Sequence, residues 1–260
     1  MELISTVKMK KAQESVQASR PFALEASKIL GILAGEGIFE TAPTVPTGKS
    51  LVILVSSNKG LCGGYNIGAF KETLALIRRN PDSKFEFVTV GKRAREFVLR
   101  TGSVLVADFS ENVKDAIAIA DARSVSRFVQ GEYRTGKYDK VYMVYGHYVS
   151  AITQKPVCRT FYPVSRESVV DFLAEIGSKV TVTETGRHEI EPSPSHVVSA
   201  TLPLILDLMT YEHLLEAKAS EHAARMVAMK NAKDSAQKKA AALTLTYNKA
   251  RQSAITKEIT

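Results

Sequence analysis

Leu204–Thr260, with the sequence LILDLMTYEHLLEAKASEHAARMVAMKNAKDSAQKKAAALTLTYNKARQSAITKEIT, is the stretch that decides the fold of this chain. It contains no Gly and no Pro, and it is rich in Ala, Lys, Glu, Leu, Met and Gln, which favour helices. At about 1.5 Å per residue, one helix over this stretch would be roughly 85 Å long. A compact domain does not need so long a rod. The sequence therefore predicts a mechanical part, a tether or one helix of a coiled coil.

The surface pattern of this helix differs from that of a strong dimeric coiled coil, in which Leu, Ile or Val alternate at spacings of three and four. Leu206 and Met209 begin such a seam, but it continues into His213, Glu216 and Ser220. Alanines then recur every fourth residue, in a row that winds around the helix. They are Ala224, Ala228, Ala232, Ala236 and Ala240. Many other positions are basic, so two interpretations stay open: a solvated helix face, or a smooth basic shaft that turns against a partner surface.

A second helix is predicted at the other end of the chain, over Met1–Leu33, where apolar residues recur on one face at helical spacing. Pro21 is expected to kink or restart this helix, and Gly35 and Gly37 to end it. A connector rich in Pro and Thr follows at Thr41–Ser50. Two helical ends therefore flank the middle of the chain, and the natural arrangement brings them together as an antiparallel pair.

The middle of the chain alternates strands and helices. The apolar run Leu51–Ser57 is typical of a strand buried on both faces. The other predicted strands are Lys84–Val90, Ser103–Phe109, Tyr138–Tyr145 and Ile152–Phe161. The predicted helices are Ile67–Arg79, Lys92–Arg100 and Glu111–Tyr133. This order predicts a largely parallel sheet that is covered by helices.

The segment Val164–Glu191 is harder to assign. It combines a helical stretch at Ser168–Ile176 with a strand-like one at Lys179–Thr185. Pro194 then fits the start of the long helix, where a proline is tolerated, whereas Pro203 indicates a kink or a later start.

Composition narrows the class of protein. The chain has 260 residues and a formal net charge of +8, which suggests an acidic partner: nucleic acid, anionic lipid or an acidic protein surface. No apolar run approaches the ~20 residues of a membrane span, and the amphipathic N-terminus lacks the apolar core of a secretory signal. Two cysteines, Cys62 and Cys158, fit a reducing compartment.

Two segments imitate phosphate-binding loops. Thr47–Ser50 reads TGKS, the end of a P-loop, but Pro43 stands where that motif needs Gly, and the segment precedes a strand instead of following one. The loop Ser57–Asn66 follows the first strand and opens a helix, where α/β folds bind phosphates. It reads G-x-x-G-G, however, and the second strand ends at Val90–Lys92 without an acidic residue for a ribose. A tight turn that lets the loop and a helix pack closely is the favoured interpretation.

No other constellation indicates catalysis. The five histidines are scattered and form no metal-binding motif. Cys62 has no identifiable His partner and is expected to be a packed thiol. We therefore predict no catalytic residue, no cofactor and no metal.

Specific motifs in five stretches resemble those of a known family. The stretches are KMKKAQ (Lys8–Gln13), ASRPF (Ala18–Phe22), SSNKGLCGGYN (Ser56–Asn66), SEHAARMVAMKNA (Ser220–Ala232) and Leu243–Thr260. In this order, over the whole chain, the sequence resembles the gamma subunits of F-type ATP synthases, which form the central shaft.

This resemblance implies an α/β fold with a long antiparallel coiled coil of the terminal helices and a central Rossmann-like α/β domain. The corresponding ranges are 1–40, 41–190 and 191–260. It also implies a non-catalytic rotor that couples proton flow to ATP synthesis or hydrolysis. The expected partners are the alpha and beta subunits of the ring, an epsilon-type subunit and the ring of membrane c subunits, without nucleic acid. The expected location is peripheral, on the inner face of a bacterial plasma membrane or, alternatively, of a mitochondrial inner membrane.

Partner-binding residues also follow from the resemblance. Arg251 and Gln252 match positions that contact a beta-subunit loop, and Lys8 and Met9 lie in the matching part of the other helix. Two further contacts are expected at Lys59, in the glycine-rich stretch, and at Glu191, near the foot that meets the c ring. Family members usually extend beyond both ends of this sequence, so a fragment, an ordered core or a shortened variant is expected.

Two other classes of function would require different features of the sequence. A basic nucleic-acid-binding α/β module with a helical arm would interleave aromatic and basic residues, yet the arm after Tyr211 carries only Tyr247. A nucleotide-dependent enzyme would depend on the loop at Ser57–Asn66.

Overall fold

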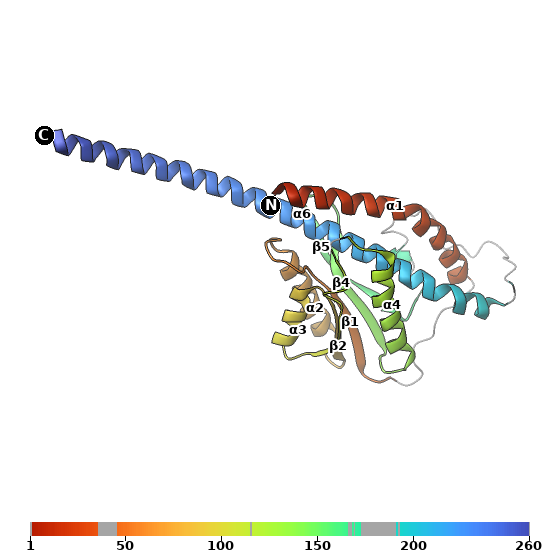
Figure 1. The fold of residues 1–260 in the computed structure, drawn as a ribbon. Helices are drawn as coiled ribbons and strands as arrows, with labels where there is room; N and C mark the ends of the chain where they lie inside the picture. The colour runs from red at the N-terminus through yellow and green to blue at the C-terminus, as the bar shows by residue number, and fades with distance from the viewer. Residues whose placement is uncertain are drawn as a thin grey trace.

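The structure, a computed structural model, describes residues 2–35, 46–114, 116–165, 168, 170–172, 191 and 193–259. The elements in chain order are α1 (Glu2–Gly35), β1 (Lys49–Val55), α2 (Tyr65–Arg79), β2 (Lys84–Val90), α3 (Lys92–Arg100), β3 (Val104–Asp108), α4 (Ile119–Arg134), β4 (Lys140–Tyr148), β5 (Gln154–Tyr162) and α6 (Pro194–Ile259). Figure 1 shows the sheet with its helices as one body, from which the C-terminal part of α6 projects.

The five strands form one sheet in the order β3-β2-β1-β4-β5. The pairings β1–β2, β1–β4 and β2–β3 are parallel, and only β4–β5 is antiparallel. The residues of β1 alternate between two cores: Leu51 and Ile53 belong to one, Val52 and Leu54 to the other. All four are fully buried. The prediction of a largely parallel sheet with a central strand buried on both faces is therefore confirmed.

Helices cover both faces of the sheet. The core around Val52 and Leu54 includes residues of α2 and α3, and the core around Leu51 and Ile53 includes residues of α4 and α6. The part of α6 from Leu202 to Ala223 is thus built into the α/β body. Helix α1 lies antiparallel along α6, as expected for the terminal helices (Figure 1).

Most predicted elements have the expected type, with shifts of a few residues at their ends. The helix predicted from Glu111 is wrong in its first turns, because α4 begins only at Ile119. Asp121 accounts for this start: its Oδ2 accepts a hydrogen bond from the backbone N–H of Ala118, at 2.9 Å. The preceding segment is instead held by the burial of Val113 and Ile117 in the core.

Prolines lie inside both terminal helices. Pro21 lies within α1, which continues past it and bends along its length (Figure 1). Pro203 lies within α6, which begins at Pro194, so a later start of this helix is wrong. Of the helix expected at Ser168–Ile176, only Ser168 and residues 170–172 are described, and they are helical. The strand expected at Lys179–Thr185 lies outside the described residues.

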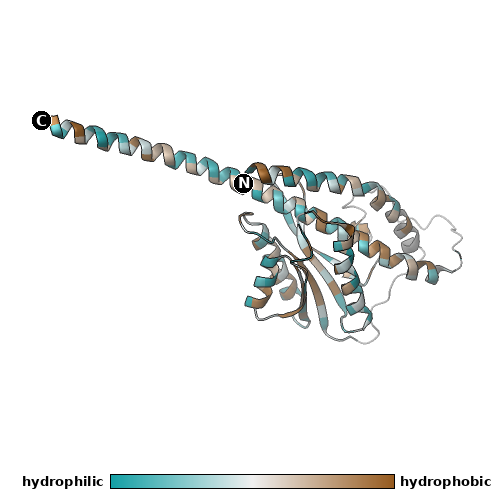
Figure 2. Cartoon of the chain, in the orientation of Figure 1, coloured by the Kyte–Doolittle hydropathy of each residue, from teal (hydrophilic) through white to brown (hydrophobic). Residues whose placement is uncertain are grey.

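Hydropathy changes along α6. Figure 2 shows hydrophobic residues gathered where α6 crosses the sheet, and a mainly hydrophilic surface on the projecting part. Within the described part of the chain, none of the helices is long and apolar enough to cross a membrane.

Candidate functional site

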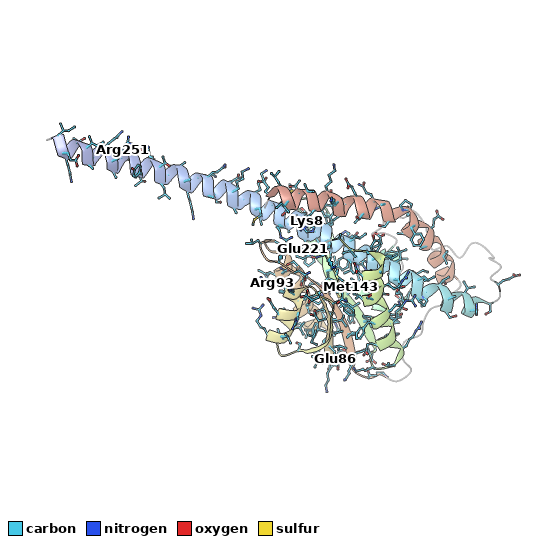
Figure 3. The ribbon with its side chains drawn as sticks, in the orientation of Figure 1. Lys8, Glu86, Arg93, Met143, Glu221 and Arg251 are labelled. Atoms are coloured by element: carbon cyan, nitrogen blue, oxygen red, sulfur yellow. The ribbon has the colours of Figure 1, made fainter. Side chains whose placement is uncertain are left out.

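The projecting end of α6 is the first candidate for contact with a partner. Every described residue from Lys230 onward is exposed. Lys233 still meets Glu2 of α1, with Nζ and Oε2 3.4 Å apart. We call the part beyond it, Asp234–Ile259, the C-terminal arm; its 26 residues correspond to about 39 Å of helix. Arg251 lies toward its far end (Figure 3), and Gln252 follows directly on the same arm.

The arm has the composition of a binding surface. It carries five basic and two acidic residues. It also exposes large apolar side chains: Leu243, Leu245, Tyr247, Ile255 and Ile259. Leu243 and Tyr247 are four residues apart and therefore share a face of the helix. This combination of apolar anchors and positive charge suits the surface of another protein that offers apolar pockets and acidic groups.

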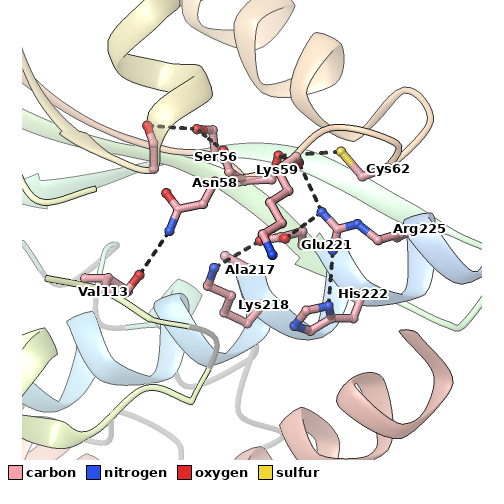
Figure 4. A network of polar contacts seen from close by, with 12 residues as sticks. Ser56, Asn58, Lys59, Cys62, Val113, Ala217, Lys218, Glu221, His222 and Arg225 are labelled. Atoms are coloured by element: carbon pink, nitrogen blue, oxygen red, sulfur yellow. Dashed lines mark hydrogen bonds and ion pairs between the residues drawn. The ribbon is translucent and has the colours of Figure 1, made fainter. Parts of the chain in front are cut away.

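A polar joint links α6 to the loop Ser57–Gly64, which we call the Gly loop (Figure 4). Arg225 donates from Nη2 to the carbonyl oxygen of Lys59 at 3.1 Å and from Nε to that of Gly60 at 3.3 Å. Its Nη2 also lies 2.8 Å from Oε1 of Glu221, one turn earlier in α6. One guanidinium therefore binds two neighbouring loop carbonyls and a carboxylate of its own helix.

The charges of this joint are buried, with one carboxylate between two cations. Glu221 Oε2 lies 3.1 Å from Nζ of Lys218, so its carboxylate faces a cation on each side. The side chains of Glu221, Lys218 and Arg225 are 4%, 7% and 12% exposed. His222 Nδ1 lies 3.2 Å from Arg225 Nη1. Charges this deeply buried are tolerated only where hydrogen bonds and opposite charges surround them, so the geometry of the joint is narrowly defined.

Tyr65, the first residue of α2, adds a second link to α6. Its hydroxyl donates a hydrogen bond to the carbonyl oxygen of Ala217 at 3.0 Å. Burial raises the pKa of this hydroxyl well above its ordinary value, and the charge of Glu221 raises it further, so it stays a donor. Gly146 makes room for the ring, because a Cβ at this position would lie 2.4 Å from Cε2 of Tyr65.

The Gly loop is shaped for close packing. Leu61 and Gly63 have φ angles of 62° and 56°, in the left-handed region that favours glycine. An ideal Cβ on Gly63 would lie 3.8 Å from Cβ of Ala228 in α6. The loop therefore passes directly over the alanine row of the helix. This geometry agrees with the tight-turn interpretation of the motif.

Contacts inside the Gly loop account for Cys62. Its thiol is buried, 3.2 Å from Nδ2 of Asn66 and 3.6 Å from Oγ of Ser57. The backbone N–H of Ser57 donates to Oδ1 of Asn66 at 3.0 Å. Cys62 is thus a packed part of the loop, as the sequence predicts. Among the described residues, no group of three His, Cys, Asp or Glu side chains is placed to hold a metal ion.

The segment that imitates a P-loop is bound by a side chain of the protein itself. The Asp139 carboxylate accepts hydrogen bonds from the backbone N–H groups of Thr47 and Gly48, at 2.6 and 2.8 Å, and from Thr47 Oγ1 at 2.9 Å. Burial alone would raise the pKa of Asp139, but these bonds and one from the backbone of Lys49 hold it below its ordinary value. A carboxylate therefore occupies the donors that a phosphate would need.

The six residues expected to bind partners lie in three separate places. Lys8 of α1 and Lys59 of the Gly loop line one cavity of about 520 Å³, between α1, the loop and α6. Met9 follows Lys8 on α1 and is partly buried. Arg251 and Gln252 lie on the arm, whereas exposed Glu191 precedes the opposite end of α6. About 57 residues of helix, roughly 85 Å, separate Pro194 from Arg251.

The sequence pattern does not predict the polar residues that fix α6 to the body. Asp207 is 2% exposed, and its Oδ2 lies 3.0 Å from Arg127 and 3.4 Å from Arg123, both on α4. His147 of β4 has its Nδ1 2.7 Å from Oε2 of Glu216. One signal was present: Asp207 interrupts the apolar run LPLILDLM, and an isolated charge there needs a buried partner.

The chain is similar to known proteins along its whole length. The family model described as ATP synthase matches residues 1–260. The ATP synthase gamma chain of Symbiobacterium thermophilum is 35% identical over 269 aligned residues, which cover 100% of this chain and 88% of the relative. That of Akkermansia muciniphila is 30% identical, with the same coverage.

Solved structures share the fold. A chain of the Tetrahymena thermophila mitochondrial ATP synthase central stalk and c-ring superposes with a TM-score of 0.64 at 24% identity, covering 90% of this chain and 97% of that one. A chain of the Euglena gracilis mitochondrial ATP synthase rotor gives a TM-score of 0.54 at 18% identity, covering 98% of both chains. A sheet body with a projecting helix is therefore a known architecture.

Proposed function

We propose that this chain, which belongs to the ATP synthase gamma-chain family, is the central rotor shaft of an F-type ATP synthase. The observation that carries this proposal is the match to gamma chains along the entire sequence, at 30–35% identity. Rotation of the shaft couples proton flow through the membrane sector to ATP synthesis or hydrolysis in a ring of alpha and beta subunits. The similar structures, which come from a central stalk and from a rotor, support this role.

The architecture suits such a function. The arm is a single exposed helix that can enter a ring of other subunits, and the α/β body is too broad to follow it (Figure 1). The terminal helices form the antiparallel coiled coil, with residues 1–40 and 191–260 as the shaft and 41–190 as the central domain. Smooth alanine-rich surface and positive charge allow the arm to turn against an acidic partner without a single locked position.

The subunit itself is non-catalytic in this proposal. The nucleotides bind to the ring, not to the Gly loop. Arg225 and Ala228 of α6 already lie against that loop, and Asp139 occupies the N–H groups of the other phosphate-loop imitation.

The partners follow from the same proposal. Arg251 and Gln252 of the arm contact a loop of a beta subunit, and Lys8, Met9 and Lys59 provide further contacts where α1 meets the body. Glu191 faces the ring of c subunits, and an epsilon-type subunit binds the central domain. The complex is peripheral to an energy-transducing membrane, on the cytoplasmic side in a bacterium or the matrix side in a mitochondrion.

Co-purification tests the proposal. The chain is expressed with alpha and beta subunits of a bacterial ATP synthase, and the eluate is assayed for ATP hydrolysis. We expect a stoichiometric complex whose hydrolysis depends on this chain. Absence of a complex with this chain and with a version extended to the length of its relatives would rule the rotor function out.

The proposed contacts are tested in the same complex. Replacing Arg251 and Gln252 together by Ala should lower ATP hydrolysis about fivefold, the factor that corresponds to the loss of a contact of about 1 kcal/mol. The matched control is Lys238→Ala, which removes a charge from the same exposed arm. Equal losses in both variants would contradict a specific role for Arg251 and Gln252.

A further inference from the structure

We propose that Arg225 is the positioning residue that passes torque between α6 and the α/β body, through its bonds to the Gly loop. This inference rests on the proposed rotor function. It assigns a mechanical role to a motif whose form alone suggested a ligand site. Arg225 touches no substrate; it fixes the angle at which the body is held on the helix.

The need for such a joint follows from the shape of α6. The hydrophobic effect is not directional, so the angle at which the body sits on α6 depends on side-chain packing and on polar contacts. Hydrogen bonds are directional. Arg225 binds the adjacent carbonyls of Lys59 and Gly60 at 3.1 and 3.3 Å, beside the axis of the helix, and therefore opposes rotation of α6 against the loop.

The joint also lies at the end of the buried part of α6 that is nearest to the arm. Within the described part of α6, polar contacts with the body are made by Pro203, Asp207, Glu216, Ala217 and Arg225, among others. Of these five, Arg225 is nearest to the arm. Torque that enters through the arm reaches the Gly loop before it reaches the other four.

Both sides of the joint are stiff. On the helix side, Glu221 holds Arg225 at 2.8 Å and is itself held by Lys218 at 3.1 Å. On the loop side, Asn58 ties the Gly loop to the body: its Oδ1 accepts from the backbone N–H of Lys92 at 3.0 Å, and its Nδ2 donates to Val113 O at 3.4 Å. A force on Lys59 and Gly60 is therefore passed to α3 and to the segment before α4.

Substitution of Arg225 tests the joint in the complete ATP synthase, reconstituted in liposomes. The measurement is the ratio of ATP-driven proton pumping to ATP hydrolysis. Arg225→Met should lower this ratio at least threefold while hydrolysis continues. Arg225→Lys keeps a charge for Glu221 but lacks the planar fork that binds two carbonyls, so it should give an intermediate ratio.

The matched control is Arg79→Met. Arg79 also pairs with a glutamate, Glu72, but both lie on α2, so this pair joins no two elements. The control should keep the wild-type ratio. A wild-type ratio in assembled Arg225→Met complexes would overturn the proposal.

A reversible cross-link distinguishes a loss of torque transfer in Arg225→Met from a defect in folding. The 3.8 Å between an ideal Gly63 Cβ and Ala228 Cβ lies within the range of a disulfide. We expect Gly63→Cys with Ala228→Cys, combined with Arg225→Met and Cys62→Ser, to recover the coupling ratio on oxidation and to lose it again on reduction. Gly63 has a positive φ, so the substitution there costs stability, but it does so in both redox states.

Both outcomes of the cross-link are informative. A ratio that is the same in the oxidised and reduced complexes would contradict the joint, because the two states differ only in that link. Failure of the rotor proposal is distinguishable: in that case the wild-type complex itself would show no pumping that depends on this chain.

Discussion

At the scale of single residues, the joint between α6 and the body depends on side chains that come close to backbone carbonyls. Tyr65 reaches the carbonyl of Ala217 only because Gly146 leaves room for its ring. The Gly loop turns through left-handed angles at Leu61 and Gly63, directly after the two carbonyls that Arg225 binds. A glycine thus leaves the space that a large side chain needs.

The substitution Gly146→Ala adds one carbon atom and tests whether the space beside Tyr65 is needed. The new Cβ would lie 2.4 Å from Cε2 of Tyr65, so ring and strand must separate. We expect a loss of about 1–3 kcal/mol in the free energy of unfolding. Urea unfolding measures it. The control is Gly131→Ala in α4, where a Cβ meets nothing within 4 Å and should leave stability equal or up to about 1 kcal/mol higher. Equal effects of the two substitutions would show that the contact with Tyr65 does not matter.

Acid sensitivity is predicted at Glu86. Hydrogen bonds from Tyr138 and from Lys49, at 2.6 and 2.9 Å, hold its pKa below the ordinary value of 4.5. A carboxyl whose folded pKa is lowered stabilises the fold at every pH above its unfolded pKa, and this contribution is lost as pH falls through the folded pKa.

The measurement is urea unfolding between pH 7 and pH 3. We expect Glu86→Gln to be less stable than wild type at pH 7 and the difference to shrink below about pH 4.5. The control Glu258→Gln, at the exposed end of the arm, should follow the wild-type curve. A difference that stays constant with pH would refute the role of the Glu86 charge.

At the scale of elements, α6 belongs to two environments. Its first part crosses the sheet and buries charged residues such as Asp207, Lys218 and Glu221, which form ion pairs with α4 or within α6 itself. Its last part is exposed on all sides. One continuous helix therefore connects a rigid body to a surface made for contact, and the connection depends on the ion pairs that hold the buried part.

Asp207 links α6 to two arginines of α4. Asp207→Ala leaves Arg123 and Arg127 without their carboxylate. Because both arginines are about half exposed, water compensates part of the loss, and we expect about 1–3 kcal/mol. Thermal and urea unfolding measure it, with Asp234→Ala on the arm as the control. A loss below 0.5 kcal/mol, roughly the effect of an ordinary surface change, would contradict the link.

At the scale of the whole molecule, a folded body and a bare helix coexist in one chain. The body has two cores, one on each face of the sheet. The arm stands outside both. A helix without tertiary packing is only marginally stable in water, so the two parts differ in local stability.

Limited trypsin digestion of the free chain tests this difference. We expect the first cuts at the basic residues of the arm, such as Lys238, Lys239 and Lys249, with the body intact. Mass spectrometry identifies the fragments, and circular dichroism should give the same melting temperature for the body before and after the arm is lost. A first cut within 46–165 would contradict the prediction.

Residue type and spacing by themselves determined a good part of this protein. Helix-forming composition predicted α6, and a continuous apolar run predicted β1, because these signals act between neighbours in the chain. The glycines of the Gly loop indicated a tight turn for the same local reason. The binding roles of Arg251, Gln252, Lys8, Met9, Lys59 and Glu191 stay predictions.

Only the tertiary structure decided which parts of the chain meet. Arg225 binds carbonyls that lie about 165 residues earlier, and Asp207 binds arginines about 80 residues earlier. It also decided that β5 runs antiparallel to β4. Such contacts depend on how the chain returns to itself, and a buried charge selects its partner only when folding brings one within hydrogen-bonding distance.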